Sequence, residues 1–243
     1  MTIPIDTIIL DIEGTVCPIT FVKEILFPYF LNKLPTVLSK LQFPINSMSS
    51  DSIIQILSLL PPEERSTPEI TFKHFKQLVD DDIKDPILKS LQGHIWEQGY
   101  NDGELQAPIY DDSIEFIKQF TQENSNKIYI YSSGSINAQI LLFSHVNDNG
   151  NSVDLTKYLS GYFDILSAGF KSDPSSYIRI LDEINKSDSP KSVLFLSDNV
   201  NEVKAAIEAG MQSYIVVRPG NSPLSDDDKS TYKIIHSLDE LDL

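Results

Sequence analysis

With 243 residues, 41% of them hydrophobic, the chain is long enough to bury a sizeable core as one large domain or two smaller ones. Its 35 acidic and 19 basic side chains leave a net charge of -16, which disfavours nucleic acid and anionic membrane surfaces as partners. No apolar run approaches the roughly 20 residues that span a bilayer, and the N-terminal segment lacks the basic residues of a secretory signal. We therefore expect a cytoplasmic protein, and its mass of 27.3 kDa leaves access to the nucleus open. Its single cysteine, Cys17, excludes an internal disulfide and is expected to be a small packed thiol.

Short runs rich in β-branched and aromatic residues recur along the chain and predict buried parallel strands. They lie at residues 7–10, 127–132, 162–167, 192–197 and 213–217. Helix-like segments alternate with the later runs and begin at residues 111, 135, 173 and 201. Strands that alternate with helices indicate a parallel α/β sheet. The tail from residue 218 begins as a turn-rich loop and ends in a short apolar piece that we expect to pack on the core.

One long gap interrupts this alternation. From residue 19 to residue 108 the sequence shows helical periodicity and no strand run, with proline-containing breaks at 60–69 and 85–86. An inserted helical domain is the simplest interpretation. We therefore predict a core domain formed by residues 1–18 and 109–243 and a helical domain formed by residues 19–108.

Two carboxylates, Asp11 and Glu13, directly follow the first predicted strand and precede Gly14. Alternate residues of an extended chain face the same side, so we expect the two side chains to converge where the strand ends. Ligand sites in parallel sheets lie at these carboxyl ends. A solvated turn after a strand is the alternative, and this stretch alone does not decide between the two.

Polar residues also follow the other predicted strands. Ser132 and Ser133 end the second run just before a helix, where hydroxyl and N–H groups can bind an anion. Ordinary helix capping is the simpler explanation for these serines taken alone. Lys171 precedes the helix that begins at residue 173, and Asp198 follows the fourth run, where a carboxylate suits a hard cation.

Because these residues follow successive strands of one sheet, we expect them to gather at one edge. An acid pair, a serine pair, a lysine and a further acid together predict phosphoryl transfer. A carboxylate can attack phosphorus and form an aspartyl-phosphate when Mg²⁺ and a lysine offset the repulsion between the two anions. The same positive charge would attract a phosphorylated substrate that the net charge of -16 otherwise repels.

The order of these residues resembles the motifs of the haloacid dehalogenase superfamily of phosphatases. Its first motif, normally Asp-x-Asp-Gly-Thr, reads DIEGT here, and the other three correspond to the serine of IYSS, to Lys171 and to the acid of FLSDN. Nearly the whole chain resembles one subfamily, the methionine-salvage enolase-phosphatases or acireductone synthases. The stretches that carry this resemblance are DIEGT followed by CPITFVKEILFPYF, then LQGHIWEQGYNDGEL, IYSSGS and VVRPGN. The resemblance implies an α/β fold with a haloacid dehalogenase-like Rossmannoid core of parallel strands and an inserted helical cap domain.

The resemblance also implies roles for the acidic residues. Asp11 would be the nucleophile, and Asp11, Glu13 and Asp198 would organise a Mg²⁺ ion. Glu13 departs from the pattern, because most superfamily phosphatases carry a second Asp there as the general acid. Its longer reach suggests a part in proton abstraction beside a ketone. Whether Glu13 acts through its side chain or through its backbone carbonyl on the metal stays open.

The serine pair, Ser132 and Ser133, and the catalytic Lys171 would bind the substrate. The implied substrate is a small phosphorylated diketone, 2,3-diketo-5-methylthiopentyl 1-phosphate, which is enolised and then dephosphorylated to the acireductone. No nucleic acid and no membrane are expected as partners, and we expect a monomer.

Two other functions compete with this interpretation. A haloacid dehalogenase-type phosphatase of another small metabolite would share the core chemistry and differ in the cap and at residue 13. A receiver-like phospho-binding module also uses an aspartate, a lysine and Mg²⁺ on a parallel sheet, although the long insert between the first two motifs favours a lidded enzyme. A catalytically inactive binding protein on the same fold is disfavoured because every charged motif residue is retained.

Some polar residues have no assigned role at this stage. His94 and Trp96 could line a cap pocket for the methylthio tail, but packing inside the helical insert is the commoner outcome. The acidic run at 80–82 lacks the glycine and distal glutamate of a calcium loop, so a solvated helix face is favoured. Glu202 is equally well explained as a residue that orients the metal site and as an exposed helix residue.

Overall fold

The computed structural model describes residues 3–46, 50–123 and 125–242 of the chain. They form two compact units, one made of the chain up to Phe21 together with the chain from Gln106 onward, and the other of Val22–Leu105. The second unit lies in the part of the sequence where the inserted domain is predicted, at 19–108. None of the described helices is both long and apolar enough to cross a membrane.

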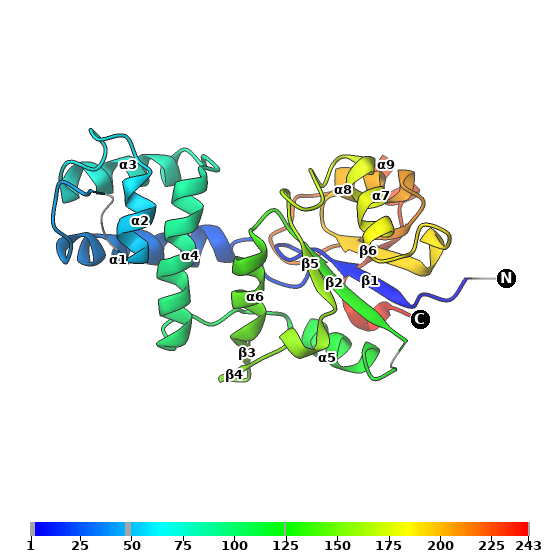
Figure 1. Ribbon diagram of the computed structural model, residues 1–243. Coiled ribbons are helices and arrows are strands. Elements are labelled where there is room, and N and C mark those ends of the chain that lie inside the picture. Colours follow the sequence, from blue (N-terminus) through cyan, green and yellow to red (C-terminus); the bar gives the residue numbers. More distant parts are fainter. Residues whose placement is uncertain (1–2, 47–49, 124, 243) are drawn as a thin grey trace. The chain divides into compact units, whose positions relative to one another are not determined.

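A parallel six-stranded sheet forms the centre of the larger unit (Figure 1). Its strands, in spatial order, are β5 Gly161–Phe163, β2 Lys127–Tyr131, β1 Thr7–Leu10, β6 Val193–Ser197, β7 Gln212–Val216 and β8 Ile234–Ile235. The register places Leu10 opposite Ile130 and Leu196. The residues that follow the three central strands therefore start from the same edge of the sheet, and the predicted parallel α/β core is confirmed.

Helices connect the strands and cover both faces of the sheet. They are α5 Asp111–Phe120, α6 Ile136–Ser144, α7 Pro174–Glu183, α8 Val200–Glu208 and α9 Asp226–Thr231, with short turns η2 Thr156–Tyr158, η3 Pro190–Ser192 and η4 Leu238–Glu240. Figure 1 shows α7 and α8 on one face and α5 on the other. Ser135, Asp173 and Asn199 cap α6, α7 and α8 by accepting a hydrogen bond from a backbone N–H of the first turn.

The strands differ from the sequence prediction in two respects. The strand predicted at 162–167 ends at Phe163, because the Asp164 carboxylate accepts hydrogen bonds from the N–H groups of Leu166 and Ser167 at 3.0 and 2.8 Å and closes a turn. Three short strands were not predicted: β8, and the hairpin of β3 Val146–Asp148 with β4 Asn151–Val153. Runs of two or three residues are too short to show a hydrophobic period.

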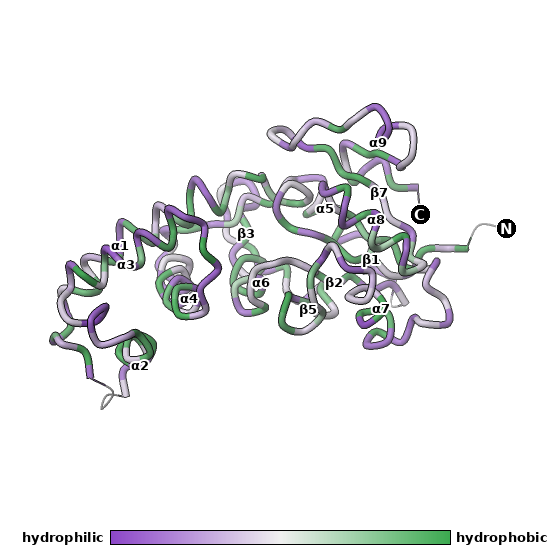
Figure 2. The backbone as a smooth tube through the Cα atoms, turned by 90° about the horizontal axis from the view of Figure 1, so that it is seen from above, coloured by the Kyte–Doolittle hydropathy of each residue, from purple (hydrophilic) through white to green (hydrophobic). Residues whose placement is uncertain are grey.

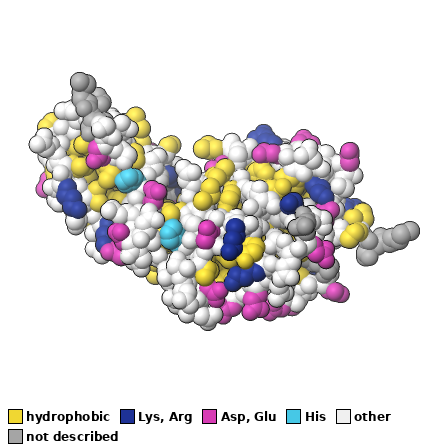
Figure 3. All heavy atoms as spheres, turned by 60° about the horizontal axis from the view of Figure 1, so that its bottom comes forward, with side chains coloured by type: hydrophobic (Ala, Val, Ile, Leu, Met, Phe, Trp, Pro, Cys, Tyr) yellow, Lys and Arg dark blue, Asp and Glu magenta, His cyan; other side chains and the backbone are white. Residues whose placement is uncertain are grey.

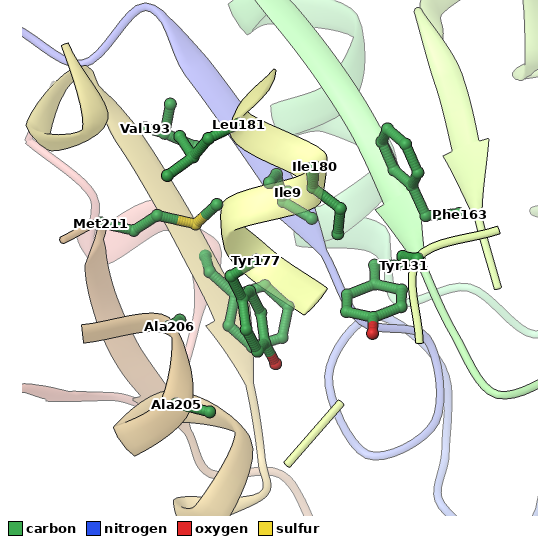
Figure 4. Packing of buried hydrophobic residues seen from close by; sticks show 12 residues of the cluster. Ile9, Tyr131, Phe163, Tyr177, Ile180, Leu181, Val193, Ala205, Ala206 and Met211 are labelled. Carbon is green, nitrogen blue, oxygen red and sulfur yellow. The ribbon is translucent and has the colours of Figure 1, made fainter. Parts of the chain in front are cut away.

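A buried aromatic cluster joins the sheet to α7 and α8 (Figure 4). The rings of Tyr131 and Tyr177 meet edge to face, with centroids 5.5 Å apart. The hydroxyl groups of both tyrosines bind the loop before α7. The Tyr131 hydroxyl donates to the Gly169 carbonyl at 2.8 Å, and the Tyr177 hydroxyl donates to the Lys171 carbonyl at 2.7 Å. The apolar core and the loop are therefore linked by buried hydrogen bonds.

The described residues of the smaller unit form helices joined by turns and loops, and none of them lies in a strand. A π-helical turn, η1 Val22–Leu26, leads into α1 Phe27–Ser39, followed by α2 Ser52–Ser58, α3 Pro68–Asp80 and α4 Pro86–Asn101. The apolar faces of these helices meet in a core that includes Phe30, Leu34, Phe75 and Leu91. Hydrophobic and hydrophilic residues alternate along α1 in Figure 2, as expected for a helix with one buried side.

The surface of the protein is rich in charge. Figure 3 shows acidic and basic side chains interspersed over one face. In Figure 2, α9 is among the most hydrophilic segments, and its sequence DDDKST carries acidic residues in the first turn.

The C-terminal apolar piece packs on the core as predicted, since Leu238 is buried.

Candidate active site

Asp11 lies at the carboxyl end of β1, at the centre of the sheet edge. Its backbone N–H donates to the Leu196 carbonyl at 3.0 Å, and its side chain is buried, with a relative exposure of 6% for the whole residue. One carboxylate oxygen, Oδ1, accepts from Lys171 Nζ at 2.5 Å. The other, Oδ2, lies 3.3 Å from the Ser197 hydroxyl and 3.4 Å from the Thr15 hydroxyl. Both oxygens of the predicted nucleophile are therefore oriented by donors.

Lys171 is buried between two carboxylates. Its Nζ lies 2.5 Å from Asp11 Oδ1 and 2.7 Å from Glu202 Oε2, and the rings of Tyr131 and Phe195 approach it at 5.7 and 5.9 Å. Burial lowers the pKa of Lys171, but the two carboxylates outweigh burial and hold that pKa above its ordinary value. The ammonium group is therefore charged at neutral pH and provides the fixed positive charge that the sequence predicts.

Glu202 is part of this cluster, so the interpretation as an exposed helix residue is wrong. It lies in the first turn of α8, and its Oε2 accepts from Lys171 Nζ at 2.7 Å and from the Ser197 hydroxyl at 2.8 Å. Burial and the charge of Asp11 raise the pKa of Glu202, whereas Lys171 and Ser197 oppose that shift. Glu202 thus holds the lysine together with Asp11, and the Ser197 hydroxyl lies within hydrogen-bond distance of both carboxylates.

Asp198 follows β6 and lies close to the same cluster. Its backbone N–H donates to the Thr15 hydroxyl at 3.1 Å. Burial, followed by the negative charges of Asp11 and Glu202, raises the pKa of Asp198 to about 7. Burial is the largest cause of this shift, and the charge of Lys171 only partly offsets the contribution of the two carboxylates.

Gly14 is required at its position by both backbone conformation and space. Its φ is +74°, a left-handed conformation that other residues adopt only with strain. A Cβ atom at this position would lie 2.5 Å from Asp198 Oδ2 and 3.0 Å from Asn221 Oδ1. The Asp198 carboxylate therefore packs directly against the backbone of the DIEGT loop.

The serine pair follows β2, as predicted, but its two members differ in exposure. Ser132 is buried, its N–H donates to the Phe163 carbonyl, and its hydroxyl accepts from the Gly134 N–H at 3.3 Å. Ser133 is exposed. Helix capping is performed by the next serine, Ser135, whose hydroxyl accepts from the Ala138 N–H. The capping alternative therefore holds for residue 135, while the Ser132 hydroxyl closes the turn before α6.

Glu13 lies in the turn that follows β1 and not in the strand itself. β1 ends at Leu10, and the Ile12 carbonyl accepts from the N–H groups of Thr15, Val16 and Cys17. Glu13 forms an isolated bridge with Cys17, and burial together with the charge of Glu13 raises the pKa of the Cys17 thiol. Cys17 is buried and packed, as predicted.

A divalent cation fits the donor chemistry of this edge. Within residues 3–46, 50–123 and 125–242, no three or more His, Cys, Asp or Glu side chains form a group that could hold a metal ion. The carboxylates of Asp11 and Asp198 together with a backbone carbonyl would still suit a hard cation, because such ions accept carbonyl oxygen and water as ligands. The carboxylates of Asp11 and Glu202, whose charges add to burial in raising the pKa of Asp198, are the groups that a cation bound here would offset.

Two polar residues of this cluster were not predicted to belong to it. Ser197 is the last residue of β6 and is completely buried between Asp11 and Glu202. Thr15 is also completely buried and contacts both Asp11 and the N–H of Asp198. The signal that could have identified Ser197 is its place directly before Asp198, since a hydroxyl at the end of a buried strand needs a polar partner.

Trp96 and the acidic run at 80–82 bond neighbouring residues of the smaller unit. Trp96 is buried, and its indole N–H donates to the Leu26 carbonyl at 2.9 Å, which favours the packing interpretation over a pocket. His94 is half-buried. The acidic run 80–82 is exposed, as predicted, and its side chains bond neighbours within the segment 76–84. It lies at the end of α3 and in the turn that follows, so the predicted helix face is wrong for Asp81 and Asp82.

The parallel α/β fold and the polar residues at the carboxyl ends of its strands define a class of enzyme. A sequence profile of the haloacid dehalogenase-like hydrolases matches residues 5–210, which is most of the chain. The chain therefore belongs to the haloacid dehalogenase-like hydrolase family, as its resemblance implies.

Curated relatives narrow this assignment. A protein of Candida tropicalis named enolase-phosphatase E1 is 66% identical over 242 residues, which cover 98% of this chain and 99% of the relative. A protein of Candida albicans with the same name is 63% identical over 256 residues, which cover 99% and 97% of the two chains. Identity of this extent over nearly the full length places the chain among the enolase-phosphatases E1.

Solved structures agree with this placement. The UTR4 protein of Saccharomyces cerevisiae superposes with a TM-score of 0.83 at 41% identity, covering 98% of this chain and all of the yeast chain. CbbY of Rhodobacter sphaeroides, solved in complex with phosphate, superposes with a TM-score of 0.59 at 16% identity, covering 98% and 96%. The second likeness shows the shared fold alone.

Proposed function

We propose that this chain enolises 2,3-diketo-5-methylthiopentyl 1-phosphate and then hydrolyses its phosphate ester to give the acireductone of methionine salvage. The observation that carries the phosphatase chemistry is the buried ion pair between Asp11 Oδ1 and Lys171 Nζ, 2.5 Å apart at the carboxyl end of the central strand. The high identity to proteins named enolase-phosphatase E1 supports the choice of substrate.

In the proposed reaction Asp11 is the nucleophile. A carboxylate oxygen of Asp11 forms a bond to phosphorus while the bond from phosphorus to the substrate oxygen breaks, which leaves an aspartyl-phosphate. Water then cleaves this acyl phosphate, releases inorganic phosphate and regenerates the carboxylate. Lys171 keeps Asp11 oriented and offsets the charge of the phosphoryl group, and the hydroxyls of Ser132 and Ser133 are proposed to bind phosphate oxygens.

We propose that the metal is Mg²⁺, with Asp11, Asp198 and the backbone carbonyl of Glu13 as its protein ligands. Bound there, it would supply the positive charge that lets an anionic nucleophile approach a dianionic phosphate. The Glu13–Gly14 peptide is held in place because the Gly14 N–H donates to the Cys17 carbonyl at 2.8 Å. In a trans peptide the Glu13 carbonyl therefore points away from Cys17.

The enolisation step needs a group that removes a proton beside a ketone, and we propose the Glu13 carboxylate for it. Glu13→Asp shortens the side chain by one methylene while keeping its charge. If the assignment holds, this variant slows the appearance of the enediol more than it slows phosphate release from a simple phosphate ester. If enolisation and phosphate release both proceed at wild-type rates in Glu13→Asp, this role is excluded.

We also propose that the unit Val22–Leu105 is the cap domain that selects the substrate, and that residues 1–18 and 109–243 of the predicted core carry the chemistry. Cytoplasm and nucleus are the proposed compartments, and the single buried thiol of Cys17 suits their reducing conditions. A monomer is the proposed assembly, and light scattering of the purified protein tests it.

The experiment that tests the function follows enediol absorbance and released phosphate together in a stopped-flow reaction with Mg²⁺ and the diketo-phosphate. We expect an enediol signal that precedes phosphate. Asp11→Asn should abolish phosphate release in a protein whose circular dichroism matches the wild type. Turnover of other phosphate esters with none of the diketo-phosphate would instead indicate a phosphatase of another metabolite, and a single turnover without further release would indicate a receiver-like module.

A further inference from the structure

The stretch VVRPGN at residues 216–221 has no role in the chemistry described so far. It leaves the carboxyl end of β7 and so begins at the same sheet edge as Asp11. Residues 218–221, called here the clamp loop, form a turn in which the Asn221 N–H donates to the Arg218 carbonyl at 3.2 Å. Gly220, with a φ of +89°, supplies the left-handed conformation that this turn requires.

The clamp loop binds two consecutive carbonyls of the DIEGT loop. Asn221 Nδ2 donates to the Gly14 carbonyl at 2.8 Å, and Arg218 Nε donates to the Thr15 carbonyl at 2.9 Å. Thr15 is completely buried, where an unpaired carbonyl is unfavourable. The two side chains thereby fix the peptide planes that follow Gly14 and Thr15.

Thr15 transmits this restraint to the reacting groups. Its hydroxyl lies 3.4 Å from Asp11 Oδ2 and accepts from the Asp198 N–H at 3.1 Å. A shift of the Thr15 backbone therefore changes contacts with both acidic residues. The Asp198 carboxylate also packs against Gly14, whose carbonyl is the atom that Asn221 binds.

Arg218 is itself held rigidly. It is buried, its Nη1 donates to the His236 carbonyl at 3.1 Å, and its Nη2 donates to Asp112 Oδ2 at 2.7 Å. Its guanidinium carbon lies 4.5 Å from the centre of the Tyr110 ring. A planar, permanently charged group with fixed donor directions, anchored at its far end, suits the positioning of a backbone carbonyl at its near end.

We propose that Arg218 and Asn221 are positioning residues for the nucleophile, acting through the backbone of Gly14 and Thr15. The reaction they serve is the one proposed above, so this inference rests on that function. Neither side chain is within bonding distance of Asp11 in the contacts described, and their effect reaches it through Thr15. They should therefore affect kcat more than KM.

The test compares two variants of the clamp loop with one control in the full-length protein. Arg218→Lys keeps a positive charge beside Asp112 but loses the Nε donor to Thr15, and Asn221→Ala removes the donor to Gly14. The control is Ser237→Ala, which removes a hydroxyl that donates to Asp112 Oδ2 at 2.9 Å and leaves both bonds to the DIEGT loop. The measurements are kcat and KM for the diketo-phosphate with Mg²⁺, together with hydrogen exchange of a peptide spanning residues 11–17.

We expect both clamp variants to lower kcat about 10- to 100-fold, as displacement of a reacting group by part of an ångström does. KM should stay within about threefold in both, and exchange of residues 11–17 should become faster. Ser237→Ala should keep kcat within about twofold, since it leaves the loop contacts intact.

Other outcomes would overturn the inference. They are wild-type kcat in folded clamp variants, unchanged exchange of residues 11–17, or a loss of kcat in Ser237→Ala equal to that in the clamp variants. If the wild type does not convert the diketo-phosphate at all, the proposed function fails. The exchange comparison still decides whether the clamp loop restrains residues 11–17.

Discussion

Gly14→Ala tests the close contact of the DIEGT loop with Asp198, and a Cβ there would also crowd Asn221 Oδ1 at 3.0 Å. The new Cβ would lie 2.5 Å from Asp198 Oδ2, whereas ordinary contact begins at 3.4 Å, so the carboxylate must retreat by about 0.9 Å. Misplacement of a reacting group by about 1 Å lowers a rate by about 100-fold. The left-handed φ of +74° adds about 1–2 kcal/mol of strain, and the overlap about 1–3 kcal/mol more.

The matched control is Gly150→Ala in the same structural unit. Gly150 also has a left-handed φ, of +86°, but a Cβ there meets nothing within 4 Å. Conformational strain should therefore lower the free energy of unfolding of Gly150→Ala by about 1–2 kcal/mol, which corresponds to about 2–8 °C in Tm. The variant should keep its activity. The difference between the two variants measures the crowding of Asp198, with a smaller part from Asn221, separately from the cost of the backbone conformation.

The assays are steady-state phosphate release at saturating Mg²⁺ and unfolding in urea. We expect Gly14→Ala to show a kcat about 100-fold below the wild type and a free energy of unfolding below that of Gly150→Ala. A Gly14→Ala protein with kcat within threefold of the wild type would refute the view that Asp198 must occupy the space beside this glycine. So would equal activity losses in the two variants.

Three further predictions concern the charges around the site. Glu202→Ala removes one of the two carboxylates that hold Lys171. We expect kcat to fall about 10- to 100-fold in a steady-state assay. A wild-type kcat in this variant would contradict the anchoring role of Glu202. Burial raises the pKa of Asp112, but the hydrogen bonds from Arg218 and the Leu238 N–H outweigh it and hold that pKa below the ordinary 3.8. The pair therefore stabilises the fold above about pH 4 and loses this contribution as pH falls through the folded pKa. Asp112→Asn should accordingly lower the free energy of unfolding by about 3 kcal/mol at pH 7, measured by urea titration, and by progressively less below pH 4. A difference between variant and wild type that does not change with pH would exclude the link between the Asp112 charge and stability. Removal of divalent ions with EDTA should abolish phosphate release without changing circular dichroism, and Mg²⁺ should restore it; full activity in EDTA would exclude a metal role.

The sequence by itself determined the architecture of the larger unit. Strands β1, β2, β6 and β7 are continuous runs rich in β-branched and aromatic residues, and helices begin at capping residues such as Ser135 and Asp173, so local patterns suffice to recognise these elements. Because parallel strands end at one edge, the order of Asp11, Ser132, Lys171 and Asp198 along the chain was enough to predict a common site. The strand at 162–167 was too long in that prediction because the turn closed by Asp164 has no hydrophobic period.

Only the tertiary structure decided which side chains complete the site. Glu202 pairs with Lys171, and Arg218 reaches the carbonyl of Thr15 across 203 positions of sequence. β1 also ends at Leu10, so Glu13 lies in a turn and outside the strand from which its alternation with Asp11 was predicted. Such contacts depend on how distant segments pack and on which buried polar group needs a partner, and a local pattern of residues carries no record of either.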